Sequence, residues 1–450
     1  MTHQARRRAL CHQLDANCAV ILAAAPQRTR SKNQPYRFVQ DKDFLYFTGF
    51  DEPDAVAVIR PGHAEPFVLF CRPRDPEAET SFGARLGPQG VVDTLGADRG
   101  YPLAQLDEVL PTLLEGRTRV LLGDEEQRLT QRAWGWANQQ RRSTKFDQRR
   151  HFRSLEPLAG VAHEMRVIKS ETEIALLRHA VSAACDAHRV VMTHTAPGVN
   201  ERQLSQAFNA TLAHWGCESD PYPNIVAGGE RALCLHYDCN DQPLLAGELL
   251  LIDAGAEYQG YASDITRTYP VSGRFSAPQR QLYELVLSAL DAAIAEVAPG
   301  VPWGRLYDTA CRVLTQGLLE LGILEGELET LLDQQAHKRF SVHKTGHFLG
   351  LDVHDVGQYR QADGQWRPLA PGMVLTLEPG LYIPSDAEDL DPRWRGIAVR
   401  VEDDILVTHT GAENLSASAP RTVDELERLV GSQPITRSVH VPAHPHPELR

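Results

Sequence analysis

The chain has 450 residues, of which 42% are hydrophobic and 23% charged, and its formal net charge is −13 at pH 7. This length suffices for two or more domains with sizeable cores, and the composition is ordinary for a soluble globular protein. The acidic balance disfavours nucleic acid as a partner, because phosphate binding requires clustered basic residues. The N-terminal apolar run over 18–25 is too short to span a membrane, and no signal peptide is recognised, so we expect a cytoplasmic protein.

Residues 1–165 alternate strand and helix patterns and are predicted to form an α/β domain. An aromatic segment over 44–50 is interpreted as part of the core of this domain. The domain contains no glycine-rich phosphate loop, so a nucleotide site is not supported. Strands are expected over 19–25, 55–59, 66–70 and 119–122, and a helix is expected over 103–114.

A second domain is predicted over 166–430, where Ser170 and Glu173 form a capping box ahead of a long amphipathic stretch. The tail over 431–450 contains His440, His444 and His446 among prolines, and we predict that it is disordered. Within the second domain, helices are expected over 174–193, after Asn200, and over 277–297, 303–321 and 423–429, and strands around 224–226 and 233–236.

Two stretches of the second domain share one pattern: a glycine, five residues, an acid, one residue and a glycine. The acid is Asp253 in the first stretch and Glu378 in the second, and each follows an apolar run that predicts a buried strand. A neighbouring strand in each half supplies further acids, Asp264 in the first and Glu402 in the second. Solvated turns would explain one such motif, but the repetition indicates an internal duplication.

Two related halves that face each other would bring these four carboxylates to one centre. Adjacent carboxylates in an apolar setting repel one another and are costly to desolvate, which bound metal cations remedy. His347 lies between the two acid motifs, and an imidazole beside carboxylates favours manganese, cobalt, iron or zinc. Four carboxylates balance two divalent cations, which can activate a shared water for attack on a carbonyl.

These motifs together closely resemble those of the pita-bread metallopeptidases, and within them the bacterial aminopeptidase P (Xaa-Pro aminopeptidase) branch. The resemblance covers nearly the whole chain, including Tyr46-Phe-Thr-Gly-Phe50 in the first domain. It implies an α/β N-terminal domain for substrate access and oligomerisation, followed by an α+β pita-bread catalytic domain with a pseudo-two-fold duplication. The segments that carry it are Leu-Ile-Asp253-Ala-Gly, Asp264-Ile-Thr-Arg, Gly-His347-Phe-Leu-Gly-Leu-Asp-Val-His354-Asp, Glu378-Pro-Gly and Arg-Val-Glu402-Asp-Asp.

The resemblance also implies roles for individual residues around two divalent metal ions, usually Mn²⁺ in this family. Asp264 and Glu402 would bridge the two ions, and Glu378 would also position or deprotonate a metal-bridging water. His354 would stabilise the oxyanion at the scissile bond, and His236 would line the proline pocket. The implied metal ligands are Asp253, Asp264, His347, Glu378 and Glu402, and the implied substrate-binding residues are His343 and Arg400. Tyr382 is a further candidate for substrate binding, because a cleft for an Xaa-Pro bond needs donor or acceptor groups for the flanking atoms.

The expected function is therefore removal of the N-terminal residue from peptides with proline in the second position, by a homodimer or homotetramer. A prolidase, which prefers Xaa-Pro dipeptides, shares the fold and the ligands and is the close alternative. A peptide-binding pseudoenzyme and a metal-free creatinase-like hydrolase are disfavoured, because all five ligand positions are filled. Two residues depart from the family pattern: Lys344 replaces a frequent glycine, and Ser81 a tryptophan that can reach a neighbouring subunit's active site.

Overall fold

The structure is a computed structural model, which describes residues 2–124, 127–143, 152–218 and 220–435. The chain divides into two compact units, Met1–Met165 and Arg166–Arg450. Most of the tail that we predict to be disordered lies outside the described residues, and so do His440, His444 and His446. Within the described ranges, no helix combines the length and apolar character that a membrane crossing requires.

The first unit is built on a six-stranded sheet with the order β6-β5-β4-β1-β7-β8. The central strand β1 pairs antiparallel with β4 and parallel with β7, so the sheet is mixed. The predicted α/β domain is confirmed, and its four predicted strands are present. The sheet comprises β1 (Cys18–Ala23), β4 (Val56–Ile59), β5 (Phe67–Cys71), β6 (Arg99–Pro102), β7 (Arg119–Gly123) and β8 (Ser154–Pro157).

Helices surround this sheet, and a two-stranded ribbon lies outside it. The aromatic segment begins in helix α2, which Asp41 caps by accepting a hydrogen bond from the backbone N–H of Phe44 at 2.7 Å. Phe44, Phe47 and Phe50 are fully buried, as predicted for a core segment. The helices are α1 (His3–Gln13), α2 (Lys42–Thr48), α3 (Pro76–Phe82), α4 (Gly87–Leu95), α5 (Leu106–Leu113), α6 (Thr130–Ser143) and α7 (Ala159–Val167), and the ribbon pairs β2 (Thr29–Ser31) with β3 (Gln34–Pro35).

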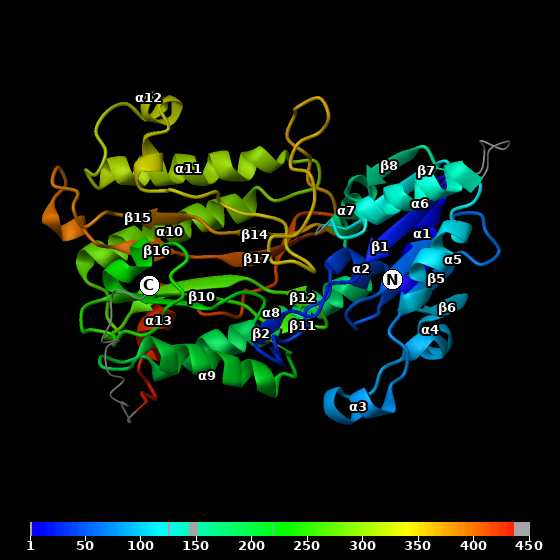
Figure 1. Ribbon diagram of the computed structural model, residues 1–450. Coiled ribbons are helices and arrows are strands. Elements are labelled where there is room, and N and C mark those ends of the chain that lie inside the picture. The colour runs from blue at the N-terminus through cyan, green and yellow to red at the C-terminus, as the bar shows by residue number, and fades with distance from the viewer. Residues whose placement is uncertain (1, 125–126, 144–151, 219, 436–450) are drawn as a thin grey trace. The chain divides into compact units, whose positions relative to one another are not determined.

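The second unit consists of short antiparallel sheets with helices on two sides. Figure 1 shows α10 and α11 on one side of the strands, and α8 and α9 on the other. Helices α8 and α9 contact strands of the first half of the unit, and α10 contacts strands of the second half. The helices are α8 (Glu171–His194), α9 (Glu201–His214), α10 (Ala277–Ala295), α11 (Trp303–Glu320), α12 (Leu328–Asp333) and α13 (Val423–Leu429).

The strands of this unit form two three-stranded sheets and two short pairs. This arrangement of duplicated sheets between helix pairs is the predicted α+β pita-bread fold. One sheet comprises β9 (Ile225–Gly228), β10 (Leu249–Ala254) and β13 (Ile265–Pro270), and the other β14 (Val374–Leu377), β17 (Asp403–Val407) and β18 (Ala412–Asn414). The pairs are β11 (Glu257–Tyr258) with β12 (Tyr261–Ala262), and β15 (Gly380–Tyr382) with β16 (Ala398–Arg400).

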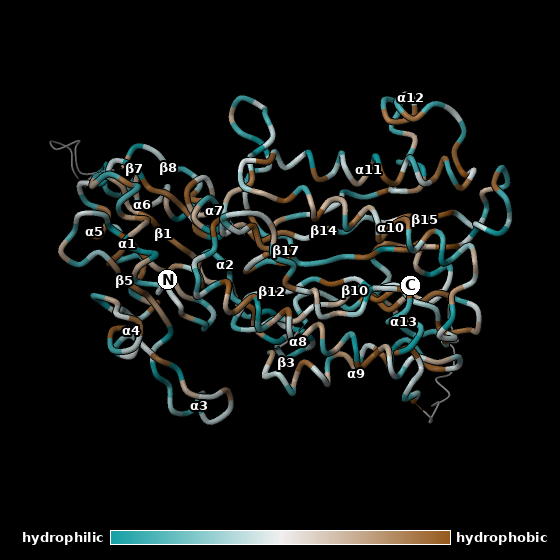
Figure 2. Tube along the Cα trace, turned by 180° about the vertical axis from the view of Figure 1, so that it is seen from behind, coloured by the Kyte–Doolittle hydropathy of each residue, from teal (hydrophilic) through white to brown (hydrophobic). Residues whose placement is uncertain are grey.

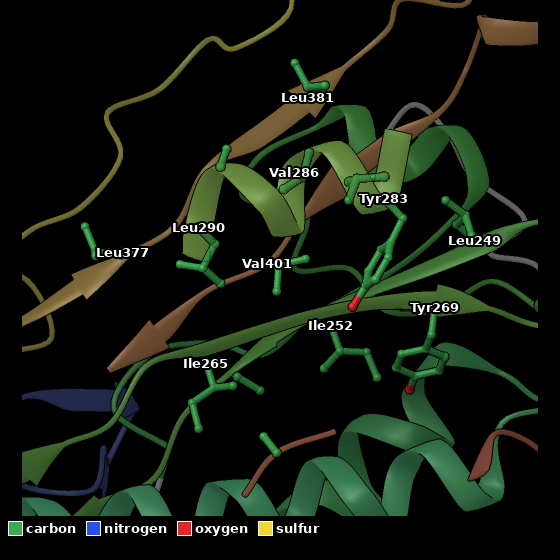
Figure 3. Close-up of a cluster of buried hydrophobic side chains, with 14 of the residues drawn as sticks. Leu249, Ile252, Ile265, Tyr269, Tyr283, Val286, Leu290, Leu377, Leu381 and Val401 are labelled. Atoms are coloured by element: carbon green, nitrogen blue, oxygen red, sulfur yellow. The ribbon is translucent and has the colours of Figure 1, made fainter. Parts of the chain in front are cut away.

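Hydrophobic side chains of both halves pack into one core. Figure 3 shows Ile252 of β10 and Ile265 of β13 on one side of this core, with Tyr283 and Leu290 of α10 on the other. Figure 2 shows hydrophobic residues along the central strands and hydrophilic residues on many of the outer loops. Full burial of one large apolar side chain contributes about 1.5–3 kcal/mol, so strands anchored in this core present residues at their ends in fixed positions.

Two local predictions have opposite outcomes. The capping box at Ser170 is confirmed, because the carboxylate of Glu173 accepts a hydrogen bond from the Ser170 backbone N–H at 2.9 Å. The strand predicted over 233–236 is wrong, because Leu233 ends a 3₁₀ helix (Gly229–Leu233) and the remaining residues form a turn without a sheet partner.

Candidate metal centre

The first pair of acids lies at the end of the β10–β13 ladder. Asp253 is the fifth residue of β10 and stands opposite Thr266 of β13. Asp264 directly precedes β13, and its side chain is almost fully buried. The connection between the strands is longer than a simple hairpin turn, because the small β11–β12 ribbon is inserted. The ladder nevertheless brings both aspartates to the same end of the sheet.

Each acid of the second pair lies in a short break between two strands: Glu378 between β14 and β15, and Glu402 between β16 and β17. The register of β14 with β17 and that of β15 with β16 together place Glu378 opposite Glu402, each in the break between two strands. The backbone N–H of Glu402 donates to the carbonyl of Thr266 at 3.1 Å, and the Thr266 hydroxyl donates to the Glu402 carboxylate at 2.7 Å. The two halves of the duplication therefore meet where their acids lie.

His347 completes this group from the loop that precedes β14. Its Nε2 lies 3.4 Å from a carboxylate oxygen of Asp264 and 3.7 Å from one of Glu378. Ligand atoms of Asp264, His347 and Glu402 all lie within 4.8 Å of one another, close enough for a single metal ion to contact all three. Three of the five sequence-predicted ligands thus converge, Glu378 lies beside His347, and Asp253 is not a member of the converging group.

The carboxylates of this group are electrostatically strained in the absence of a cation. Burial, and then the charge of Asp253, raises the pKa of Asp264. Burial, and then the charges of Asp264 and Glu378, raises the pKa of Glu402 well above its ordinary value. Burial raises the pKa of Glu378 to about 7. Burial would lower the pKa of His347, but its bond to Asp264 raises it to about 9.

Arg400 is one of few cationic side chains beside these acids, and two carboxylate oxygens have no hydrogen-bond donor among the described residues. Arg400 donates to the Asp253 carboxylate at 2.5 Å, while the second oxygen of Asp253 is buried and has no hydrogen-bond partner among the described residues. One oxygen of Asp404 is in the same situation. Buried carboxylate oxygens without hydrogen-bond partners fit divalent cations, which prefer oxygen ligands. The residues present therefore suit a centre that holds divalent metal ions.

Of the remaining predicted residues, His236, His343, His354 and Arg400 line one cleft of about 1110 Å³ beside the acids, and the buried Tyr382 lies behind its lining. His343 faces Glu378 at 3.4 Å and shares a hydrogen bond with the Tyr382 hydroxyl at 2.9 Å. Arg400 donates to the same hydroxyl at 2.6 Å, so Tyr382 is bonded on two sides. The cleft is also lined by His236, by His354, whose ring centre lies 4.4 Å from that of His347, and by Leu235, Trp303, Leu306, Tyr307 and Trp366.

Two residues that contact the acids were not identified from the sequence. The Tyr222 hydroxyl donates to Asp264 at 2.5 Å, and burial, then the charges of Asp253 and Asp264, raises its pKa well above its ordinary value. Asp404 accepts from the backbone N–H of Asp264 at 3.1 Å. Asp404 could have been singled out as the last acid of the Glu402 motif. Tyr222 lies 31 residues before Asp253 in an irregular segment, and no spacing pattern marks it.

The loop that carries His236 is held by a third residue absent from the predictions, Glu201 at the start of α9. One of its oxygens accepts from the backbone N–H of Gly228 at 3.0 Å and from Arg231 at 2.7 Å. The other accepts from the Tyr237 hydroxyl at 2.9 Å and from the backbone N–H of Gln242 at 3.1 Å. Glu201 is completely buried, and these four bonds replace the sheet ladder expected near residues 233–236.

Comparison with known proteins agrees with this geometry. The family model of metallopeptidase family M24 matches residues 175–409, and that of the aminopeptidase P N-terminal domain matches residues 3–122. The Xaa-Pro aminopeptidase of Escherichia coli is 40% identical over 95% of this chain and 97% of its own length. The mitochondrial intermediate cleaving peptidase 55 of Arabidopsis thaliana is 33% identical, over 95% of this chain and 82% of its own.

Solved structures give the same answer for the fold. The aminopeptidase PepP of Pseudomonas aeruginosa superimposes with a TM-score of 0.92 at 42% identity, over 95% of this chain and 97% of that chain. The aminopeptidase P of E. coli in complex with the inhibitor Pro-Leu superimposes with a TM-score of 0.90 at 40% identity, over 95% and 97%. Both the sequence and the folded chain match across almost their entire length. The chain belongs to metallopeptidase family M24, as a hydrolase with an aminopeptidase P N-terminal domain.

Proposed function

We propose that this protein is an Xaa-Pro aminopeptidase, which removes the N-terminal residue from peptides with proline in the second position. The observation that carries the proposal is the group of buried carboxylates around His347, in a chain 40% identical to an Xaa-Pro aminopeptidase over nearly its full length. Two divalent cations would be held by Asp253, Asp264, His347, Glu378 and Glu402. Such cations supply a water activated for attack and a polarised carbonyl.

The side chains around the acids would bind the substrate and handle its protons. Glu378 lies at the floor of the cleft, where it would accept the proton of the attacking water. His354 would donate a hydrogen bond to the carbonyl oxygen as negative charge develops on it. His236 would contact the proline ring, which has a fixed φ and no amide hydrogen. Tyr382 is fixed by Arg400 and His343, and would orient the bound peptide.

Glu201→Gln tests whether the loop of His236 must be held rigidly. Glutamine keeps one acceptor oxygen, but an NH2 group in place of the other oxygen can accept neither from Tyr237 nor from Gln242. We expect kcat/KM to fall roughly tenfold, about 1.4 kcal/mol, which is within the range for donors left unpaired. Enzyme kinetics should show this decrease in kcat/KM for the single variant Glu201→Gln. When His236→Ala is already present, adding Glu201→Gln should lower kcat/KM little further.

The milder variant Tyr237→Phe is the matched control, since it removes only one of the four hydrogen bonds to Glu201. The kcat/KM of Tyr237→Phe should lie between that of the wild type and that of Glu201→Gln. If the effects of Glu201→Gln and His236→Ala were fully additive, Glu201 would act on stability alone and not through the loop.

Substrate length separates this proposal from a prolidase activity. The cleft has a volume of about 1110 Å³ and is also lined by residues outside the acid cluster, among them Trp366 and Lys338, so it has room for residues that follow the proline. With Mn²⁺ added, we expect cleavage of Xaa-Pro-Yaa tripeptides and longer peptides, with kcat/KM about tenfold or more above that for the Xaa-Pro dipeptide. Chromatographic analysis of the products would identify the bond that is cleaved. A preference for the dipeptide would identify a prolidase, and no cleavage by the metal-loaded protein would indicate a peptide-binding role.

The family resemblance supports further proposals about the working enzyme. We propose Mn²⁺ as the metal, the cytoplasm as the location, and a homodimer or homotetramer as the assembly. The N-terminal unit would contribute to substrate access and to subunit contacts. Metal analysis of protein purified without added metal, and its mass in solution, are the direct measurements.

A further inference from the structure

The cleft carries three basic side chains on its wall, apart from Arg400 at the metal centre. They are Lys338, Lys344 and Arg360, and all three are exposed. Lys338 donates to the amide oxygen of Gln335 at 2.6 Å, and the Lys344 ammonium lies 5.1 Å from the centre of the Tyr307 ring. In the part of the chain that the structure describes, none of the three forms an ion pair with a carboxylate.

The acids of the same cleft are distributed differently. Four of the five acidic residues that line it are the proposed metal ligands at its floor, and the fifth is Asp308. Bound divalent cations would balance the four ligand carboxylates, so the wall away from the centre keeps an excess of positive charge. Such an excess inside a concave surface attracts anionic groups and disfavours cationic ones.

Among these three residues, Lys344 has the backbone that is hydrogen-bonded next to the acid cluster. Its backbone carbonyl accepts a hydrogen bond from Nδ1 of His343 at 2.7 Å. The carbonyl of the next residue, Thr345, accepts from the backbone N–H of Glu378 at 2.9 Å. The start of the Lys344 side chain is therefore held beside the acids, while its ammonium lies over Tyr307 on α11. Tyr307 is only partly buried, and a cation over such a ring at the surface is bound weakly, so the ammonium can still pair with a carboxylate.

Arg360 and Trp366 extend this basic wall. The guanidinium of Arg360 lies 3.6 Å from the centre of the Trp366 ring and donates to the carbonyl of Gly364 at 2.7 Å. Stacking fixes the plane of the guanidinium, and its remaining N–H groups stay available to an acceptor. Both residues line the cleft. The wall thus offers flexible ammonium groups and one oriented guanidinium, which together suit a carboxylate.

We propose that this basic wall selects peptides that carry a carboxylate one or two residues after the proline, and that Lys344 contributes most to the selection. The inference rests on the proposed function, because an N-terminal amine held at the acidic floor directs the residues after the proline outward along the cleft. The carboxylate can come from an aspartate or glutamate side chain, or from the C-terminus of a short peptide. Lysine or arginine at these positions is disfavoured.

The experiment compares amidated peptides Ala-Pro-Xaa-Ala in which Xaa is Glu, Gln or Lys, together with Ala-Pro-Gln that has a free or an amidated C-terminus. For the wild type at low salt we expect kcat/KM to fall in the order Glu, Gln, Lys, by about fivefold from Glu to Gln and further to Lys. The difference should shrink as salt is added, because exposed charges are screened. The free and amidated tripeptides separate the C-terminal carboxylate from the side chain as the source.

Lys344→Glu should reverse the order, so that the Lys peptide becomes the best substrate of the three. The ratio between peptides is measured within one protein, which removes any general loss of activity or folding in the variant. Arg428→Glu is the matched control: Arg428 is exposed on α13, does not line the cleft, and its replacement changes the net charge equally. It should keep the wild-type order. An unchanged order in Lys344→Glu would overturn this inference alone, whereas failure to cleave any Ala-Pro bond would overturn the proposed function.

Discussion

Asp264→Ala is expected to lower peptide hydrolysis by about 10³-fold or more and to reduce the bound metal. Its carboxylate contacts His347 and Tyr222, and its backbone N–H donates to the carboxylate of Asp404, where the two halves of the duplication meet. Asp264 is a proposed ligand of both cations, so loss of its carboxylate would weaken the binding of each of them. The same substitution removes one source of the repulsion that raises the pKa of Glu402.

The two effects of this substitution can be separated. In metal-free protein, relief of repulsion opposes the loss of the Tyr222 hydrogen bond, so we expect stability in urea within about 2 kcal/mol of the wild type. Metal content by elemental analysis and turnover with added Mn²⁺ should both fall. Asp308→Ala is the control, because Asp308 lines the same cleft but lies outside the acid cluster. This variant should bind as much metal as the wild type. Two bound equivalents with normal turnover in Asp264→Ala would rule out a dimetal centre that includes this residue.

The sequence predicts the acids well because each one is marked by a local pattern. Asp253 and Glu378 each end an apolar run of strand length, and a glycine follows two residues later. A short stretch of sequence is therefore enough to recognise each of them. Repetition of the pattern then points to a duplication, and the structure shows the two halves in contact through Thr266 and Glu402. That contact itself joins residues 136 positions apart, and no local pattern encodes it.

The predictions are wrong or incomplete where distant polar groups determine the local structure. The segment 233–236 has the apolar residues of a strand, but Glu201 binds Tyr237 and the backbone on both sides of the segment. A buried carboxylate with four donors outweighs a weak strand preference, since leaving it unpaired would be costly. Tyr222 was missed for a similar reason, because only the folded chain brings it to Asp264.

His354→Ala is expected to keep the metal but to lose roughly 10²-fold in kcat, the scale of removing one oxyanion donor. The ring of His354 lies beside that of His347 at the edge of the cleft, but it is not among the described residues whose ligand atoms converge. It can therefore face a substrate carbonyl while the metal ligands stay in place. His214→Ala is the control, because His214 is exposed on α9 and, among the described residues, forms a hydrogen bond only with Ala210 of its own helix.

The division of the effect between kcat and KM identifies what His354 does. A donor that acts mainly on the developing oxyanion strengthens in the transition state, so its loss lowers kcat and kcat/KM by similar factors and leaves KM nearly unchanged. A residue that only binds the ground state would raise KM at constant kcat. Replacement by glutamine, which still offers an N–H donor, should recover part of the lost rate if donation is the role. A variant with wild-type kinetics and full metal content would make His354 a structural residue of the loop, in which the adjacent Asp355 is already fixed by Arg166 and Lys169.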